Sequence, residues 1–381
     1  MTPNEVNRIT HNPYLSTLLC LNFIYFRVSL SNKSYIKQLD GLRFIAVAFV
    51  MAGHWVSGNT WRPFFEHLSG CGVNLFFTLS GFLITQILIV NRENESKGPL
   101  FKQFYIRRFL RIFPLYYFVL FVGCVINIPT ARNSFLWLVT YTGNIVSSFH
   151  PGILGYMGHF WTLAVEEQFY VFFPMFVLLP RKFNVKSCLL LIAIAILSRA
   201  YFYYIFRGTL LVRVAPSSFT TCCFDSFAIG AILAYFRVKY SERLKLILQR
   251  SILFIIPFLL CIVFYYLKEK GHPFLSTLFD RTCFCLFCAW LIGIAGTNGF
   301  HGIFGRLLNN PVVVYLGKIS YGLYAYHYFM PYISEYIHLP FVRISYFIIT
   351  VGLASASWFL YERPINNLKR HFEYKPVTPN A

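Results

Sequence analysis

Long apolar runs separated by short polar stretches recur along the chain from about residue 42 to residue 360. An α-helix rises about 1.5 Å per residue, so roughly 20 predominantly apolar residues cross the hydrocarbon core of a bilayer. The pattern therefore predicts an all-α, polytopic membrane bundle of about ten transmembrane helices. The predicted spans are 42–57, 73–90, 104–128, 162–180, 187–206, 217–236, 251–267, 275–297, 311–333 and 341–360.

Two stretches depart from this pattern. Ser, Thr, Asn, Gly, His and Pro interrupt the apolar run within 135–160, which favours a re-entrant or interfacial element there. The apolar patch at 15–26 is too short to span, and with no clean cleavage site it is not typical of a signal peptide. We expect a cytoplasmic N-terminal segment at 1–38, a transmembrane domain at 39–362 and a cytoplasmic tail at 363–381.

Composition agrees with the helical pattern, because hydrophobic residues make up 57% of the chain and charged residues only 13%. Soluble proteins carry about 25% charged residues. A net charge of +20 would suggest nucleic-acid binding in a soluble chain. Here most of the 34 Lys and Arg residues fall in alternate loops, and cytoplasmic loops are the ones enriched in these residues. The distribution predicts that both termini are cytoplasmic, with membrane lipids rather than nucleic acid as surroundings.

The first predicted span carries one polar group at each end, Arg43 and His54. Eleven residues on a helix return to within about 20° of the starting direction and rise about 16 Å, so both groups lie on one stripe. Ionisable groups inside a membrane are costly and usually functional. The alternative is an arginine that reaches the inner interface and a histidine at the outer one.

Carboxylates are rare in the predicted spans, where only Glu166, Glu167 and Asp225 lie well inside apolar segments. With the topology above, the segment that holds both glutamates descends from the outer face, near the end of the helix that carries His54. A histidine and two carboxylates there predict an acid–base site. A buried hydrogen-bond network that only joins helices is the structural alternative.

Arginines gather at the inner end of the third predicted span, where Arg107, Arg108 and Arg111 point within about 100° of one another. Together with Arg43 they predict a cationic pocket for phosphates, because guanidinium forks match phosphate oxygens. They could instead be ordinary cytoplasmic anchors.

The cysteines fall mostly in apolar spans, where cysteine behaves as a small hydrophobe, so we expect no metal site.

Several segments, in this order and spacing, resemble the acyltransferase-3 family of integral-membrane O-acyltransferases, which modify surface and secreted glycans and some small molecules. The resemblance covers about residues 35–365. The segments are Leu39-Asp-Gly-Leu-Arg43 through His54, Gly72-Val-Asn-Leu-Phe-Phe-Thr-Leu-Ser-Gly-Phe-Leu83, Arg107-Arg-Phe-Leu-Arg-Ile-Phe-Pro-Leu-Tyr-Tyr117, Phe160-Trp-Thr-Leu-Ala-Val-Glu-Glu-Gln-Phe-Tyr170, Asp225 with Gly230, and Leu316-Gly-Lys-Ile-Ser-Tyr-Gly-Leu-Tyr-Ala-Tyr-His327.

The resemblance implies a bacterial cytoplasmic (inner) membrane enzyme that takes an acyl group from cytoplasmic acyl-CoA, with acetyl-CoA the favoured donor. The acceptor would be a hydroxyl outside, usually on a sugar. His54 would be essential, and Arg108 and Arg111 would match the family's inner-face pair. Cys223 stands where relatives often carry an arginine. We expect no extracytoplasmic esterase-like domain of the kind that some members append, so the membrane domain or a separate partner would complete transfer.

Combined, the residues and the resemblance assign donor binding to Arg43, Arg107, Arg108 and Arg111 and catalysis to His54, Glu166 and Glu167. His54 would be the general base, with a glutamate orienting its imidazole; an acyl-histidine intermediate is an alternative. Candidate substrate-binding residues are Trp161, Tyr170, Asp225, Ser320 and His327. A transporter or flippase for a lipid-linked or anionic substrate is the competing interpretation, but it favours broken helices in matched halves, which this sequence lacks.

Overall fold

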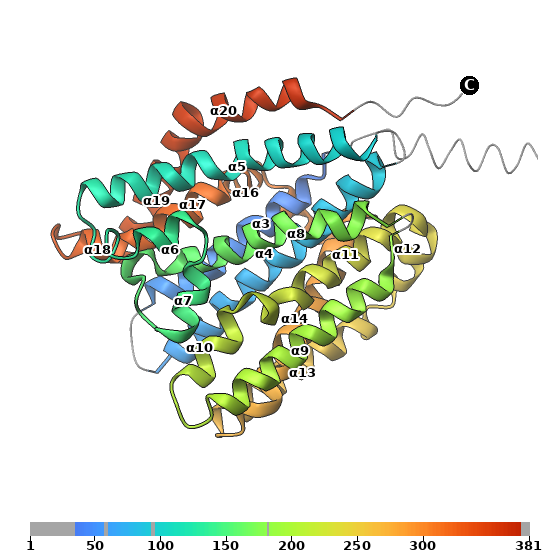
Figure 1. Ribbon diagram of the computed structural model, residues 1–381, viewed down its shortest axis with the longest axis horizontal. Helices are drawn as coiled ribbons and strands as arrows, with labels where there is room; N and C mark the ends of the chain where they lie inside the picture. The colour runs from blue at the N-terminus through green and yellow to red at the C-terminus, as the bar shows by residue number, and fades with distance from the viewer. Residues whose placement is uncertain (1–34, 57–59, 93–95, 181–182, 375–381) are drawn as a thin grey trace, which may run out of the picture.

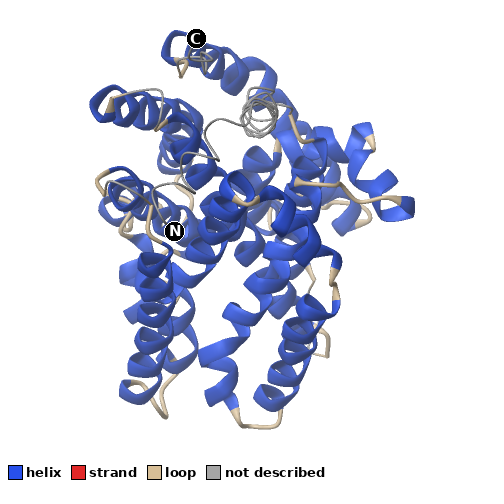
Figure 2. Cartoon of the chain, turned by 90° about the vertical axis from the view of Figure 1, so that its right-hand side faces the viewer, coloured by secondary structure: helices blue, strands red, loops and turns tan. Residues whose placement is uncertain are grey.

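The computed structural model describes residues 35–56, 60–92, 96–180 and 183–374. Within these ranges the chain consists of helices joined by short loops, without any strand (Figure 2). The predicted all-α class is confirmed. The longer helices are α3 (Lys37–Trp55), α4 (Arg62–Asn91), α5 (Lys97–Val125), α8 (Trp161–Leu178), α9 (Val185–Ile205), α11 (Phe224–Lys239), α13 (Ile252–Glu269), α14 (Pro273–Gly296) and α19 (Val342–Ser357).

Shorter helices connect these elements. They are α6 (Phe135–Val139), α7 (Gly143–Phe149), η1 (Gly155–Phe160), α10 (Leu211–Ser218), η2 (Thr220–Cys223), α12 (Ser241–Gln249), α15 (Gly302–Asn309), α16 (Pro311–Lys318), α17 (Ser320–Tyr326), η3 (His327–Phe329), α18 (Met330–Ser334), η4 (Trp358–Glu362), α20 (Arg363–Asn367) and η5 (Leu368–Phe372). The predicted re-entrant stretch 135–160 thus contains α6, α7 and η1. Residues 1–34 and 375–381, which include most of the predicted N-terminal segment, lie outside the described residues.

Seven helical segments among the described residues are long and apolar enough to cross a membrane. They are Arg62–Asn91, Lys97–Val125, Val185–Ile205, Thr220–Lys239, Ile252–Glu269, Pro273–Gly296 and Val342–Phe372. Each overlaps one of the ten predicted spans. The other three predicted spans coincide with α3, α8 and the segment α16 to α18, which are helical but are not among the seven. The count of ten and the cytoplasmic location of the termini stay predictions.

Helices α3, α4 and α11 pack closely at the centre of the bundle (Figure 1). Glycine makes the closest approach possible: a Cβ at Gly81 would overlap the carbonyl oxygen of Phe227, and one at Gly230 would overlap that of Thr78. By contrast, Cys261 is the only buried residue of α13, whose large apolar side chains face outward. Such a face suits lipid rather than water.

The segment α16 to α17 bends at Ile319 and lies beside α3. The close approach of α16 to α3 depends on Gly317, because a Cβ there would overlap the carbonyl oxygen of Asp40. The C-terminal helices α20 and η5 lie along α5 (Figure 1). These contacts place α3, α4, α5, α8 and α17 around one common space.

Candidate active site

A cavity of about 820 Å³, including the part open to solvent, lies between α3, α4, α5, α8 and α17. Its volume is in the range of small-molecule binding sites. One end is cationic, the middle carries hydroxyls and one carboxylate, and the remaining wall is apolar or aromatic. The lining residues are Arg43, Val73, Phe76, Phe77, Leu79, Ser80, Leu83, Arg108, Arg111, Ile112, Thr162, Leu163, Glu166, Tyr170, Ser320, Tyr321 and Tyr324.

Three arginines form the cationic end of the cavity. Arg43 forms an ion pair with Asp40 one turn earlier on α3. Arg108 lies over the rings of Tyr170 and Phe104, with its guanidinium carbon 5.2 Å and 5.7 Å from the ring centroids. Neither Arg108 nor Arg111 has a hydrogen bond or ion pair with any described residue. Two guanidinium groups without an ion-pair partner among the described residues, inside a largely apolar bundle, leave room for an anionic ligand.

Arg107 points elsewhere, although the sequence places it beside the other two. Its guanidinium donates to the carbonyl oxygens of Lys369 and Phe372, at 2.9 and 3.2 Å. It therefore joins α5 to the C-terminal helix η5 and is absent from the cavity lining. Arg107, although predicted as a phosphate ligand, therefore points away from the cavity that Arg108 and Arg111 line.

Glu166 is the carboxylate of the cavity. It accepts hydrogen bonds from the hydroxyls of Ser80 and Tyr170, and these two hydroxyl oxygens lie 3.0 Å apart. Glu167 is buried on another face of α8, and its Oε1 has no hydrogen-bond partner among the described residues. Helix geometry predicts this divergence, since neighbouring residues point about 100° apart.

Thr162 and Tyr324 close the end of the cavity opposite the arginines. Their hydroxyl oxygens lie 2.5 Å apart, and the Tyr324 hydroxyl donates to the carbonyl oxygen of His159 at 2.7 Å. Phe76 meets the Tyr324 ring edge-on, with 6.4 Å between centroids. Beyond this layer lie three histidines, His54, His159 and His327.

His54 contacts another histidine and not a glutamate. Its Nδ1 lies 2.8 Å from Nε2 of His327, and the two rings stack with centroids 5.0 Å apart. His54 itself is exposed, whereas His327 is completely buried. Among the described residues no hydrogen bond joins His54 to Glu166 or Glu167. The predicted acid–base trio is therefore not assembled at one place: Glu166 lines the cavity, Glu167 is buried on another face of α8, and His54 contacts His327.

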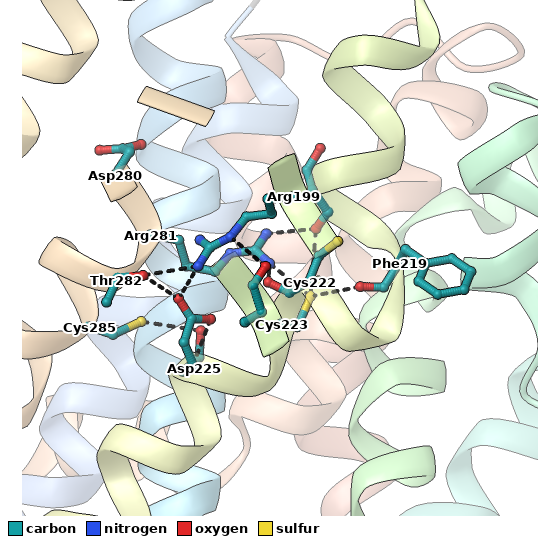
Figure 3. A network of polar contacts seen from close by, with 12 residues as sticks. Arg199, Phe219, Cys222, Cys223, Asp225, Asp280, Arg281, Thr282 and Cys285 are labelled. Carbon is teal, nitrogen blue, oxygen red and sulfur yellow. Dashed lines mark hydrogen bonds and ion pairs between the residues drawn. The ribbon is translucent and has the colours of Figure 1, made fainter. Parts of the chain in front are cut away.

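Asp225 belongs to a separate polar cluster (Figure 3). Nη2 of Arg199 lies 2.6 Å from its Oδ2, and the Thr282 hydroxyl donates to the same oxygen at 2.6 Å. The neighbouring Arg281 donates to Sγ of Cys223 at 2.8 Å (Figure 3). This cluster joins α9, α11 and α14 and is not part of the cavity lining.

The remaining predicted residues differ in position. Tyr170 and Ser320 line the cavity. Trp161 begins α8, meets Phe77 edge-on with 6.4 Å between centroids, and is absent from the lining. The sequence reasoning did not select Ser80, Thr162 or Tyr324. Ser320 could have indicated Tyr324, because residues four apart on a helix share a face.

The fold and the site define a multi-pass membrane protein with a cavity that is lined by guanidinium groups, a carboxylate and several hydroxyls. The chain belongs to the acyltransferase-3 family, whose model, described as an acyltransferase domain, matches residues 36–362. The resemblance inferred from the sequence is confirmed. No solved structure matches the chain.

Two curated relatives share much of this chain. The peptidoglycan O-acetyltransferase OatA of Listeria monocytogenes is 29% identical over 332 residues, which cover 79% of this chain and 50% of the relative. The O-acetyltransferase OatA of Staphylococcus aureus strain NCTC 8325 is 26% identical over 364 residues, covering 87% and 57%. The chain thus spans about half the length of the curated relatives it matches.

Proposed function

We propose that this protein is a membrane-bound O-acyltransferase of the bacterial inner membrane. It moves an acyl group, with acetyl favoured, from cytoplasmic acyl-CoA to a hydroxyl of an extracytoplasmic acceptor. The observation that carries the proposal is the pair of unpaired guanidinium groups, Arg108 and Arg111, in the cavity of an acyltransferase-3 protein. Acyl-CoA has phosphates to neutralise these charges and a long arm to enter the space beyond them.

The donor enters with its phosphates against Arg108 and Arg111, while Arg43 is held at the same end by Asp40. The pantetheine arm then runs past Ser80 and Glu166 toward Tyr324. His54 lies about 16 Å farther along α3 than Arg43, from the rise of eleven helical residues. Since the cavity lining ends at Thr162 and Tyr324, the thioester reaches His54 when this pair of side chains parts.

His54 acts as the general base. Neutral imidazole accepts the proton of the acceptor hydroxyl as its oxygen attacks the thioester carbonyl carbon. The tetrahedral intermediate collapses with cleavage of the carbon–sulfur bond, and the imidazolium returns the proton to the leaving thiolate. The products are an ester on the acceptor and free CoA, so protons and bonds balance without a metal or a redox step.

We propose a cell-surface or exported glycan as the acceptor. Support comes from the Listeria relative, which is named a peptidoglycan O-acetyltransferase, and from the exposed position of His54 at the end of α3. Sugar hydroxyls are weak nucleophiles near neutral pH and need a positioned base. Membrane lipids are the other proposed partners, and they contact the outward apolar side chains of helices such as α13.

The proposal is tested with the protein purified into lipid nanodiscs, where both faces are accessible. Acetyl-CoA labelled in the acetyl group is supplied with soluble peptidoglycan fragments, and base-labile acetate on the fragments is measured. The wild type transfers label, whereas His54→Gln, which keeps hydrogen bonding but not basicity, lowers transfer 10²-fold or more. Normal transfer by the Gln variant rejects His54 as the base, and no transfer by the wild type rejects this donor and acceptor pair.

A further inference from the structure

His327 connects His54 to the backbone of α17. Nδ1 of His327 lies 2.7 Å from the carbonyl oxygen of Tyr324, one turn earlier in the chain, and its Nε2 lies 2.8 Å from Nδ1 of His54. The carbonyl, the buried imidazole and the exposed imidazole thus form one continuous line of hydrogen bonds. His327 is completely buried, so it cannot itself meet an acceptor at the surface.

The direction of these hydrogen bonds follows from the first partner. A carbonyl oxygen can only accept, so Nδ1 of His327 carries the proton. In neutral imidazole the other nitrogen is then an acceptor, so Nε2 of His327 receives a hydrogen bond from Nδ1–H of His54. The remaining nitrogen of His54, Nε2, has the free lone pair, and it has no hydrogen-bond partner among the described residues.

We propose that His327 is the positioning residue of His54, holding the tautomer whose Nε2 accepts the proton of the acceptor hydroxyl. This inference rests on the proposed function, because it gives a role to His327 only if His54 is the base. The role is one that the sequence assigns to Glu166 or Glu167, and the geometry transfers it to a histidine 273 positions away from His54.

The same hydrogen bond serves the imidazolium formed during transfer. After His54 gains a proton at Nε2, its Nδ1–H still points at the lone pair of His327, while Nδ1–H of His327 remains on the Tyr324 carbonyl. The positive charge on His54 therefore lies against Nε2 of His327, an acceptor whose ring is held in place by its hydrogen bond to the Tyr324 carbonyl. Trp55 adds a second connection between the helices, because its indole N–H donates to the His327 carbonyl at 2.9 Å.

Four variants in nanodiscs separate positioning from packing, with acetyl-CoA and soluble peptidoglycan fragments as substrates. His327→Phe removes the acceptor and keeps a buried ring, and we expect kcat to fall roughly 10- to 100-fold with an unchanged KM for acetyl-CoA. His327→Gln places an amide oxygen near the lost Nε2 and restores part of kcat. Trp55→Phe removes the indole N–H that donates to the His327 carbonyl and keeps an aromatic ring beside Tyr346, and we expect kcat to stay within a few-fold of the wild type.

The fourth variant combines His54→Gln with His327→Phe. If His327 acts only through His54, the second substitution does not lower the residual transfer of the first. A further loss in the double variant, an unchanged kcat in His327→Phe, or an equal loss in Trp55→Phe each overturns the positioning role. Because His54→Gln alone tests the base, retained transfer in that variant rejects the proposed mechanism, whereas retained transfer in His327→Phe rejects only this inference.

Discussion

Three arginines within five residues of α5 have different surroundings. Arg108 and Arg111 line the cavity without a hydrogen bond or ion pair to any described residue, whereas Arg107 donates to the carbonyl oxygens of Lys369 and Phe372. A guanidinium that keeps protein partners is not free for a ligand. The proposed donor site therefore includes two of the three, with Arg43 as a neighbour whose charge Asp40 partly balances.

The arginines lead to a prediction on donor binding. The double variant Arg108→Ala and Arg111→Ala should bind CoA more weakly, because each charge-assisted phosphate contact contributes roughly 1.5–3 kcal/mol. Lysine at both positions should restore binding only partly, since the fork geometry is lost. Isothermal titration of CoA into the purified protein measures the effect. Arg107→Ala is the matched control and should bind CoA as the wild type does; equal affinity in all variants would make these arginines anchors only.

The adjacent glutamates provide a second prediction. Glu166→Gln should lower acetyl transfer at least tenfold, because among the described residues Glu166 supplies the one carboxylate of the cavity lining, which accepts from Ser80 and Tyr170. Glu167→Gln should keep turnover, since this buried side chain is directed away from the cavity. Transfer rates of the two variants at matched protein abundance check this. If only Glu167→Gln is inactive, the two roles are exchanged.

At the level of helices, the Arg199–Asp225 pair fastens α9 to α11 and, through Thr282, to α14 (Figure 3). Removing one member of a buried pair leaves an uncompensated charge, which costs about 3–5 kcal/mol, whereas an apolar replacement of both is often tolerated. Asp225→Ala should therefore lower the thermal stability of the detergent-solubilised protein. Arg199→Met combined with Asp225→Ala should recover part of it.

Thermal unfolding followed by size-exclusion chromatography measures this effect, with Thr282→Val as the milder control because it removes no charge. Below the unfolding temperature, Asp225→Ala should still bind CoA, since Asp225 is outside the cavity lining. Loss of CoA binding by a folded Asp225→Ala protein would restore the substrate-binding role expected from the sequence.

Across the whole molecule, helices of the bundle must run in alternating directions through the membrane. In Figure 1 the start of α5 and the helix α12 lie toward the right, and the connection from α13 to α14 lies at the lower left. Reporter fusions after Lys97, Lys245 and Lys375 should accordingly be cytoplasmic, and a fusion after Lys270 external. An external report at Lys245 would reverse the faces and place the arginines of the cavity outside.

The sequence by itself determined the helical membrane class and the family. Both depend on local properties, namely the length of apolar runs and short residue patterns such as Arg43 through His54. It also indicated that Glu166 and Glu167 diverge, because the angle between neighbouring residues on a helix is constant.

Only the tertiary structure decided which partner each polar group has. Periodicity places Arg107 near Arg108, but the packing of η5 on α5 occupies Arg107. Likewise, nothing in the spacing of His54 indicates that His327, and not a glutamate, meets its Nδ1. A sequence specifies the direction of a side chain around its own helix. Which side chain of another helix it meets depends on how the two helices are rotated and how closely they approach. Small residues such as Gly81 and Gly317 set that approach, through contacts with residues far away in the chain.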